Sequence, residues 1–186
     1  MGKSWKWLLG TWWDGLYDYL NGVEPVNGTA GLLRVRPTNY HGRALQLQCG
    51  LTLHPGDKIA ELHIASARLL VYREGRQERV AGTMAMVRAL ETALGFLARA
   101  ALEKPTLQGV KAFYGVTLLW PAAARFGFEV REIPAPLRRW GISLYERNLE
   151  CWYNSRPGRG PRRIEAREVW ISSLELQLRF GRKQAL

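Results

Sequence analysis

The sequence has little cysteine and no long apolar run. Its two cysteines, Cys49 and Cys151, form neither a CxxC pair nor a disulfide framework. This scarcity argues against a disulfide-stabilised secreted domain and favours a reducing compartment. No uncharged apolar run approaches the roughly 18 residues that a membrane-spanning helix needs. Asp14 and Asp18 interrupt the apolar stretch near the start of the chain, so we expect no signal peptide and no transmembrane segment. We therefore expect a cytoplasmic protein, at most peripheral to the inner face of the cell membrane.

The familiar signatures of catalysis are also missing. The sequence contains no Gly-x-Ser-x-Gly motif, no P-loop and no dinucleotide-binding fingerprint. Its three histidines match no strong zinc-ligand spacing, and neither cysteine has a histidine near it in sequence. We therefore predict no metal site, and it stays open whether the chain catalyses a reaction.

Positive charge is in clear excess. Lys and Arg number 27 against 16 acidic residues, which gives a formal charge of +11 and a pI near 10.2. Such a field attracts anionic lipid, acidic polymers or nucleic acid. Residues 154–163 hold arginines among glycines and prolines, with no acidic residue, and predict a flexible basic loop. This loop either binds phosphates by charge alone or is an exposed linker. Its arginines are Arg156, Arg159, Arg162 and Arg163.

An amphipathic helix rich in tryptophan is predicted over residues 4–21, where apolar side chains recur at helical spacing. Trp7 and Trp13 lie off the apolar stripe and are candidates for contact with a membrane interface or a partner. The alternative is that the stripe packs on the sheet. With its linker, this helix makes up segment 1–28.

The remaining pattern alternates strands and helices, which favours an α/β (α+β) fold with a mixed β-sheet and flanking helices. Alternation also places Cys49 on a buried strand face, and residues 37–42 form a loop. The predicted strands are 32–36, 44–49, Lys58–Ile64, 110–119, 128–133 and 174–180. The predicted helices are 82–102, 121–126 (ending at Gly127) and 137–149.

Candidate functional residues lie on two predicted strands and in the turn before the first of them. Asp57, Glu61 and His63 are three titratable side chains within seven residues. Glu61 and His63, two positions apart, project to one face and are able to share a metal or a proton; alternatively, Glu61 only orients His63. Thr117 follows Gly115 inside an apolar strand, so it faces a ligand or is a hydrogen-bonded core residue. We take Glu61, His63 and Thr117 as catalytic candidates, and Asp57 and Gly115 as ligand-binding candidates.

Several strings resemble the bacterial YkoP-like domain. They are Leu33–Arg36, Tyr40–Gly42, Gly56–Ile64, Gly115–Leu119 and Gly127–Phe128. The resemblance covers about residues 5–150, so the α/β core is expected at 29–150, and the basic loop with a last strand at 151–186. Domains of this kind occur alone or appended to polysaccharide deacetylases. The resemblance therefore implies a fold and an envelope context, and no particular reaction. Together with the excess of positive charge, it leads us to expect an accessory domain near the cell envelope that acts on an anionic lipid or polymer.

A second, architectural likeness is to GNAT-type acyltransferases. Ala124–Glu132 looks like the end of their second half, and Arg79–Met84 matches the first two positions of the motif that opens a helix and holds the pyrophosphate of coenzyme A. This likeness implies Gly82 as a ligand-binding residue and acetyl-coenzyme A as a substrate. No cofactor is expected otherwise. The alternatives to an accessory domain are thus an acyltransferase and non-specific nucleic-acid binding through the arginine loop; the oligomeric state stays open.

Overall fold

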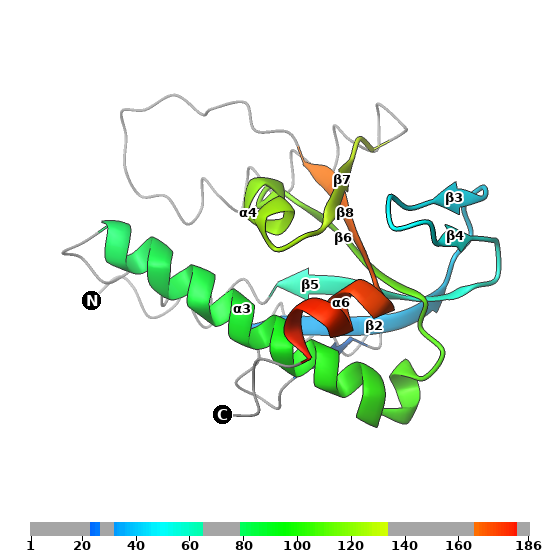
Figure 1. Ribbon diagram of the computed structural model, residues 1–186, viewed down its shortest axis with the longest axis horizontal. Helices are drawn as coiled ribbons and strands as arrows, with labels where there is room; N and C mark the ends of the chain where they lie inside the picture. Colours follow the sequence, from blue (N-terminus) through cyan, green and yellow to red (C-terminus); the bar gives the residue numbers. More distant parts are fainter. Residues whose placement is uncertain (1–22, 27–31, 65–78, 134–165, 182–186) are drawn as a thin grey trace, which may run out of the picture. The chain divides into compact units, whose positions relative to one another are not determined.

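Strands and helices alternate along the chain in the computed structural model, which describes residues 23–26, 32–64, 79–133 and 166–181 (Figure 1). The predictions for the helix at 4–21 with Trp7 and Trp13, for the helix at 137–149 and for the arginine loop lie outside the described residues. The described strands are β1 (Glu24–Pro25), β2 (Leu33–Asn39), β3 (Leu45–Gln46), β4 (Thr52–Leu53), β5 (Lys58–Ile64), β6 (Ala112–Thr117), β7 (Glu129–Arg131) and β8 (Arg167–Ser172). The described helices are α3 (Arg79–Glu103), the 3-10 helix η2 (Pro105–Leu107), α4 (Trp120–Arg125) and α6 (Ser173–Phe180).

Among the described residues, six strands form one mixed sheet in the order β1-β2-β5-β6-β8-β7, and β3 pairs with β4 in a separate ribbon. The pairs β1-β2, β2-β5 and β7-β8 are antiparallel. In the β2-β5 pair, Val35 lies opposite Leu62 and Arg36 opposite Glu61. Apolar and polar side chains therefore alternate between the two faces of this pair. The expected α+β fold, a mixed sheet with flanking helices, is confirmed.

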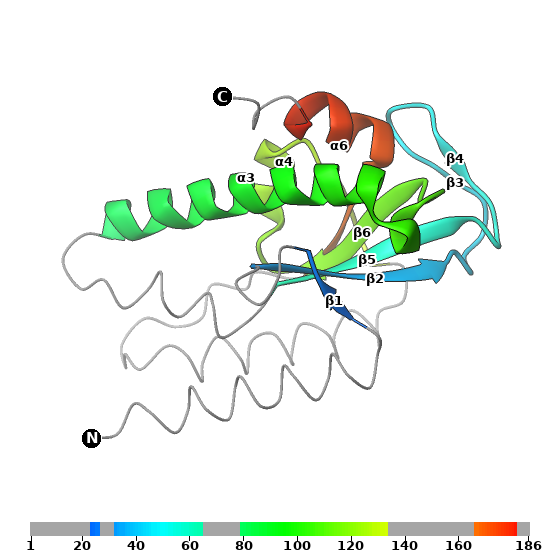
Figure 2. The same cartoon turned by 90° about the horizontal axis from the view of Figure 1, so that it is seen from below.

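The described residues divide into two compact units. The first contains β1 to β5, α3, η2, the start of β6, and α6. Figure 2 shows α3 and α6 on the same face of the β2-β5 pair. The helix α3 is amphipathic as predicted, and Leu90, Leu94 and Leu97 face the core at helical spacing. Other fully buried side chains of this core are Val35, Leu53, Leu107, Phe113 and Leu176.

The second unit contains most of β6 together with α4, β7 and β8. Its helix α4 ends as expected at Gly127, which has a φ of 89°. The Gly127 amide donates to the Ala124 carbonyl (3.0 Å), and the Phe128 amide donates to the Ala123 carbonyl (3.1 Å). This is the Schellman arrangement, whose left-handed position favours glycine because it has no Cβ. In the same unit the rings of Tyr114 and Trp170 stack with centroids 4.7 Å apart.

The last element differs from its prediction: residues 173–180 form the helix α6, not a strand. Ser172 is its N-cap, and the Ser172 hydroxyl accepts a hydrogen bond from the Glu175 amide (3.1 Å). Ser172 and Glu175 have the spacing of a capping box, a local signal of a helix start. Because α6 is a helix, the four apolar residues separate onto two faces. Leu176 and Phe180 are buried, whereas Leu174 and Leu178 are exposed.

Two further predictions in the first unit were wrong. The expected loop at 37–42 begins only at Tyr40, because β2 continues through Pro37 to Asn39. β1 pairs with β2 only at Arg34 and Val35. Pro37 lies beyond this paired part, so its missing N–H costs no hydrogen bond to β1. The expected strand at 44–49 is limited to Leu45–Gln46. A turn with Gly50 at a φ of 87° follows, and Cys49 is exposed instead of buried. No helix among the described residues is long and apolar enough to cross a membrane.

Candidate functional site

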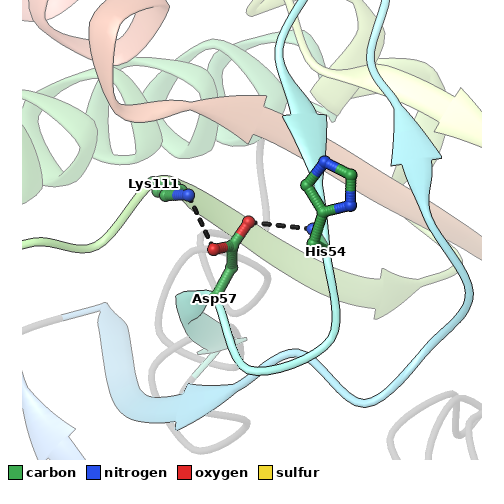
Figure 3. Close-up of polar contacts among 3 residues, drawn as sticks. All are labelled: His54, Asp57 and Lys111. Atoms are coloured by element: carbon green, nitrogen blue, oxygen red, sulfur yellow. Dashed lines mark hydrogen bonds and ion pairs between the residues drawn. The ribbon is translucent and has the colours of Figure 1, made fainter.

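A tight turn presents the first candidate, Asp57. The Asp57 amide donates to the His54 carbonyl (3.0 Å), with Pro55 second and Gly56, at a φ of 91°, third in the turn. This is the arrangement of a type II turn, whose third residue must adopt a positive φ. The turn directs the Asp57 carboxylate towards His54, the first residue of the turn. Its Oδ2 accepts from the His54 amide (2.8 Å) and its Oδ1 accepts from Lys111 Nζ (2.6 Å), as Figure 3 shows.

These contacts join two segments that are 54 residues apart in sequence. The Lys111 amide also donates to the Lys58 carbonyl (2.8 Å), so the link continues into the start of β5. The hydrogen bond from the Lys111 ammonium, followed by that from the His54 amide, lowers the pKa of Asp57 below its ordinary value. Both carboxylate oxygens of Asp57 thus have partners inside the protein. Its ligand-binding role stays a prediction.

Four polar side chains gather on one face of the β2-β5 pair: Arg34, Arg36, Glu61 and His63, called here the sheet-face cluster. The strand register places Arg36 opposite Glu61 and Arg34 opposite His63. The Arg36 guanidinium forms an ion pair with Glu61, and His63 Nε2 lies 3.7 Å from Glu61 Oε2. Glu61 and His63 therefore do share a face, as the alternation of β5 predicts, and all four residues are half-buried.

The sheet-face cluster contains more basic than acidic side chains. Its members are two guanidinium groups, one carboxylate and one imidazole. Leu33 and Val35, on the other face of β2, are buried in the core, so the two arginines lie together on the face away from it. Half-burial strengthens interactions of these charges relative to full exposure. The cluster is suited chemically to hold a carboxylate or a phosphate.

Sequence reasoning identified Glu61 and His63 but missed Arg34 and Arg36. The alternation of Leu33–Arg36 indicated that both arginines share a face. Only the pairing of β2 with β5 shows which residues lie opposite them. A strand's own pattern reveals its faces, whereas its register against another strand depends on the whole sheet.

The other candidates do not belong to this cluster. Gly115 and Thr117 lie in the second unit, where Gly115 is buried in β6 and Thr117 is half-buried. The Thr117 hydroxyl accepts a hydrogen bond from the Leu119 amide (3.0 Å), which agrees with the interpretation as a bonded threonine. Gly82 lies within the first turns of α3, because that helix begins at Arg79. Among the residues that the structure describes, no group of three or more His, Cys, Asp or Glu side chains is placed to hold a metal ion.

The fold and the cluster define an α+β domain with a polar site on one sheet face, and the comparison with family models identifies it further. The model described as YkoP domain matches residues 4–180. The chain therefore belongs to the YkoP domain family. The resemblance described under Sequence analysis ends at about residue 150. The family match continues beyond it and includes β8 and α6. Searches of curated proteins and of solved structures give no significant match.

Proposed function

We propose that this YkoP domain is an accessory binding domain that acts near the bacterial cell envelope on an anionic lipid or polymer. The observation that carries the proposal is the pair of arginines, Arg34 and Arg36, on one face of the β2-β5 pair, in a chain whose formal charge is +11. Guanidinium groups present planar forks of donors that match the oxygens of carboxylates and phosphates. Lipid headgroups and acidic envelope polymers both offer such oxygens.

The geometry gives the members of the cluster different parts in binding. Glu61 pairs with Arg36 and so holds that guanidinium in place before any ligand arrives. Preorganised donors lose less conformational entropy on binding than mobile ones. Arg34, opposite His63, brings the second positive charge to the same face. A ligand anion then meets a fixed guanidinium with a second one close by.

The proposal is tested by binding measurements on the full chain. The probes are polyphosphate and phosphatidylglycerol vesicles, and the neutral controls are dextran and phosphatidylcholine vesicles, each at low and moderate salt. We expect binding to an anionic probe, weakened by salt, and none to the neutral controls. The absence of binding to both anionic probes at both salt concentrations would refute the proposal.

Matched variants locate the site. Arg34→Gln removes one positive charge from the cluster, and Arg88→Gln removes the same charge from an exposed position on α3. A hydrogen bond to a charged group contributes about 1.5–3 kcal/mol, so Arg34→Gln should weaken binding by about tenfold or more. Arg88→Gln should have only the small effect of the lower net charge. Equal effects of the two substitutions would show that general charge, and not the cluster, holds the ligand.

A further inference from the structure

The sheet-face cluster consists of two rows that differ in chemistry. The register of β2 against β5 places Arg34 opposite His63, called here the Arg34 row, and Arg36 opposite Glu61, called here the Arg36 row. Residues two apart on a strand are separated by about 6.6–6.8 Å. The two rows therefore offer a ligand two contact points that are a short distance apart along the strands.

The Arg36 row combines hydrogen-bond donors with acceptors. Arg36 and Glu61 form an ion pair, and their charges cancel. A guanidinium has five N–H donors and a carboxylate has about four acceptor positions, so the ion pair uses only part of this capacity. A hydroxyl group donates one hydrogen bond and accepts others. The Arg36 row is therefore suited to a hydroxyl that contacts both side chains, and less suited to an anion.

The Arg34 row contains no carboxylate. The guanidinium of Arg34 presents the fork of donors that matches the oxygens of a carboxylate or a phosphate. An acidic group of a ligand is attracted to this guanidinium, whereas the carboxylate of Glu61 in the neighbouring row repels it. The two rows together therefore favour a ligand with an acidic group at one point and hydroxyl groups at the next.

We propose that the sheet-face cluster binds a polymer whose repeating unit carries an acidic group and, about one sugar ring away, hydroxyl groups. This inference rests on the proposed function and narrows its ligand to an acidic polysaccharide or a polyol phosphate. A membrane surface fits less well. Segments that bind anionic lipid by charge have about four to eight basic residues, whereas the cluster has two arginines. The side chains of Arg36 and Glu61 are also only 33% and 18% exposed, which limits their contact with a flat surface.

Three soluble polymers separate the effect of charge from that of hydroxyl groups. Polygalacturonate has a carboxylate and hydroxyls in every unit, polyglutamate has carboxylates without hydroxyls, and dextran has hydroxyls without charge. The measurement is calorimetry of the full chain with each polymer. We expect polygalacturonate to bind about tenfold more tightly than polyglutamate, because hydrogen bonds to the charged groups of the Arg36 row add to the attraction of charge. Dextran should not bind. Equal affinities for the two anionic polymers would overturn the inference.

Glu61→Gln gives effects of opposite sign in the two explanations. If charge alone held the polymers, removal of this carboxylate would strengthen the binding of both anionic polymers. We expect instead that it weakens the binding of polygalacturonate by about fivefold to tenfold, because the hydroxyl loses a charged acceptor, and does not weaken the binding of polyglutamate. The matched control is Glu103→Gln, which removes the same charge from an exposed position on α3 and should change both affinities equally. Stronger binding of both polymers by Glu61→Gln would contradict the hydroxyl contact.

A change in the ligand tests the same contact without a change in the protein. Polygalacturonate whose hydroxyls are acetylated keeps its carboxylates but can no longer donate hydrogen bonds to Glu61. The wild type should bind it about tenfold more weakly than the unmodified polymer. Equal binding of the two forms would show that the hydroxyls make no contact, even if Glu61→Gln failed to fold.

The outcomes distinguish this inference from the proposed function. If polygalacturonate and polyglutamate bind equally and Arg34→Gln weakens the binding of both, the hydroxyl contacts are wrong and the proposed function stands. If phosphatidylglycerol vesicles bind and neither anionic polymer does, the polymer is wrong and a lipid is the ligand of the proposed function. If the wild type binds no anionic polymer and no anionic vesicle, both proposals fail.

Discussion

Leu176 provides the sharpest test of the helix α6. Its side chain is fully buried, whereas that of Leu178, two residues on, is 64% exposed. Truncation of a buried leucine to alanine costs about 2–5 kcal/mol of unfolding free energy, because it removes apolar burial and leaves a cavity. Substitution at an exposed site away from such packing changes it by about 0.5 kcal/mol or less. We therefore expect Leu176→Ala to be strongly destabilising and Leu178→Ala to be nearly neutral.

The assay is urea unfolding of the full chain followed by circular dichroism, with both variants measured beside the wild type. A strand would place Leu176 and Leu178 on the same face, so equal losses in the two variants would refute the helix. The N-cap gives a second comparison within α6. Ser172→Ala should cost about 1 kcal/mol, whereas Ser172→Gly should cost only a few tenths, because glycine is itself a favourable N-cap residue and alanine is not. Equal losses from these two substitutions would contradict the capping role.

Three further predictions concern other parts of the chain. The lowered pKa of Asp57 means that its ionised form stabilises the fold above the ordinary pKa of an aspartate, and that this contribution is lost as pH falls through the lowered value. Asp57→Asn should thus be less stable than the wild type at neutral pH and lose less stability on acidification. Glu103→Gln, at an exposed position, is the control. An acid dependence of stability that is the same in Asp57→Asn as in the wild type would contradict the Lys111 contact. Because Cys49 is exposed, it should react with a thiol reagent in the native Cys151→Ser variant as fast as in denaturant, and strong protection would show that Cys49 is buried after all. Calorimetry with coenzyme A at high micromolar concentration should give no binding heat, because Arg79–Met84 matches only the first two positions of the coenzyme A motif. Saturable heat would support the acyltransferase alternative.

Local sequence patterns determined several elements correctly. The apolar spacing of α3, the alternation of β5 and the left-handed cap at Gly127 each depend on residues within a few turns of one another. Such signals are complete in a short window, because a helix stripe, a strand face or a cap is made by neighbours in sequence. The alternation of β5 is also sufficient to place Glu61 and His63 on one face of that strand.

Only the tertiary structure decided the remainder. The apolar residues of 174–180 fit a strand period, and packing of Leu176 and Phe180 against the core, with the Ser172 cap, selected the helix instead. The sheet-face cluster arises because the register of β2 against β5 brings Arg36 to Glu61, and Asp57 meets Lys111 across 54 residues of chain. A sequence pattern shows which side of an element is apolar. The packing of the whole core determines which residues of a neighbouring element lie opposite that side, because a shift of one residue in register exchanges the two faces of a strand.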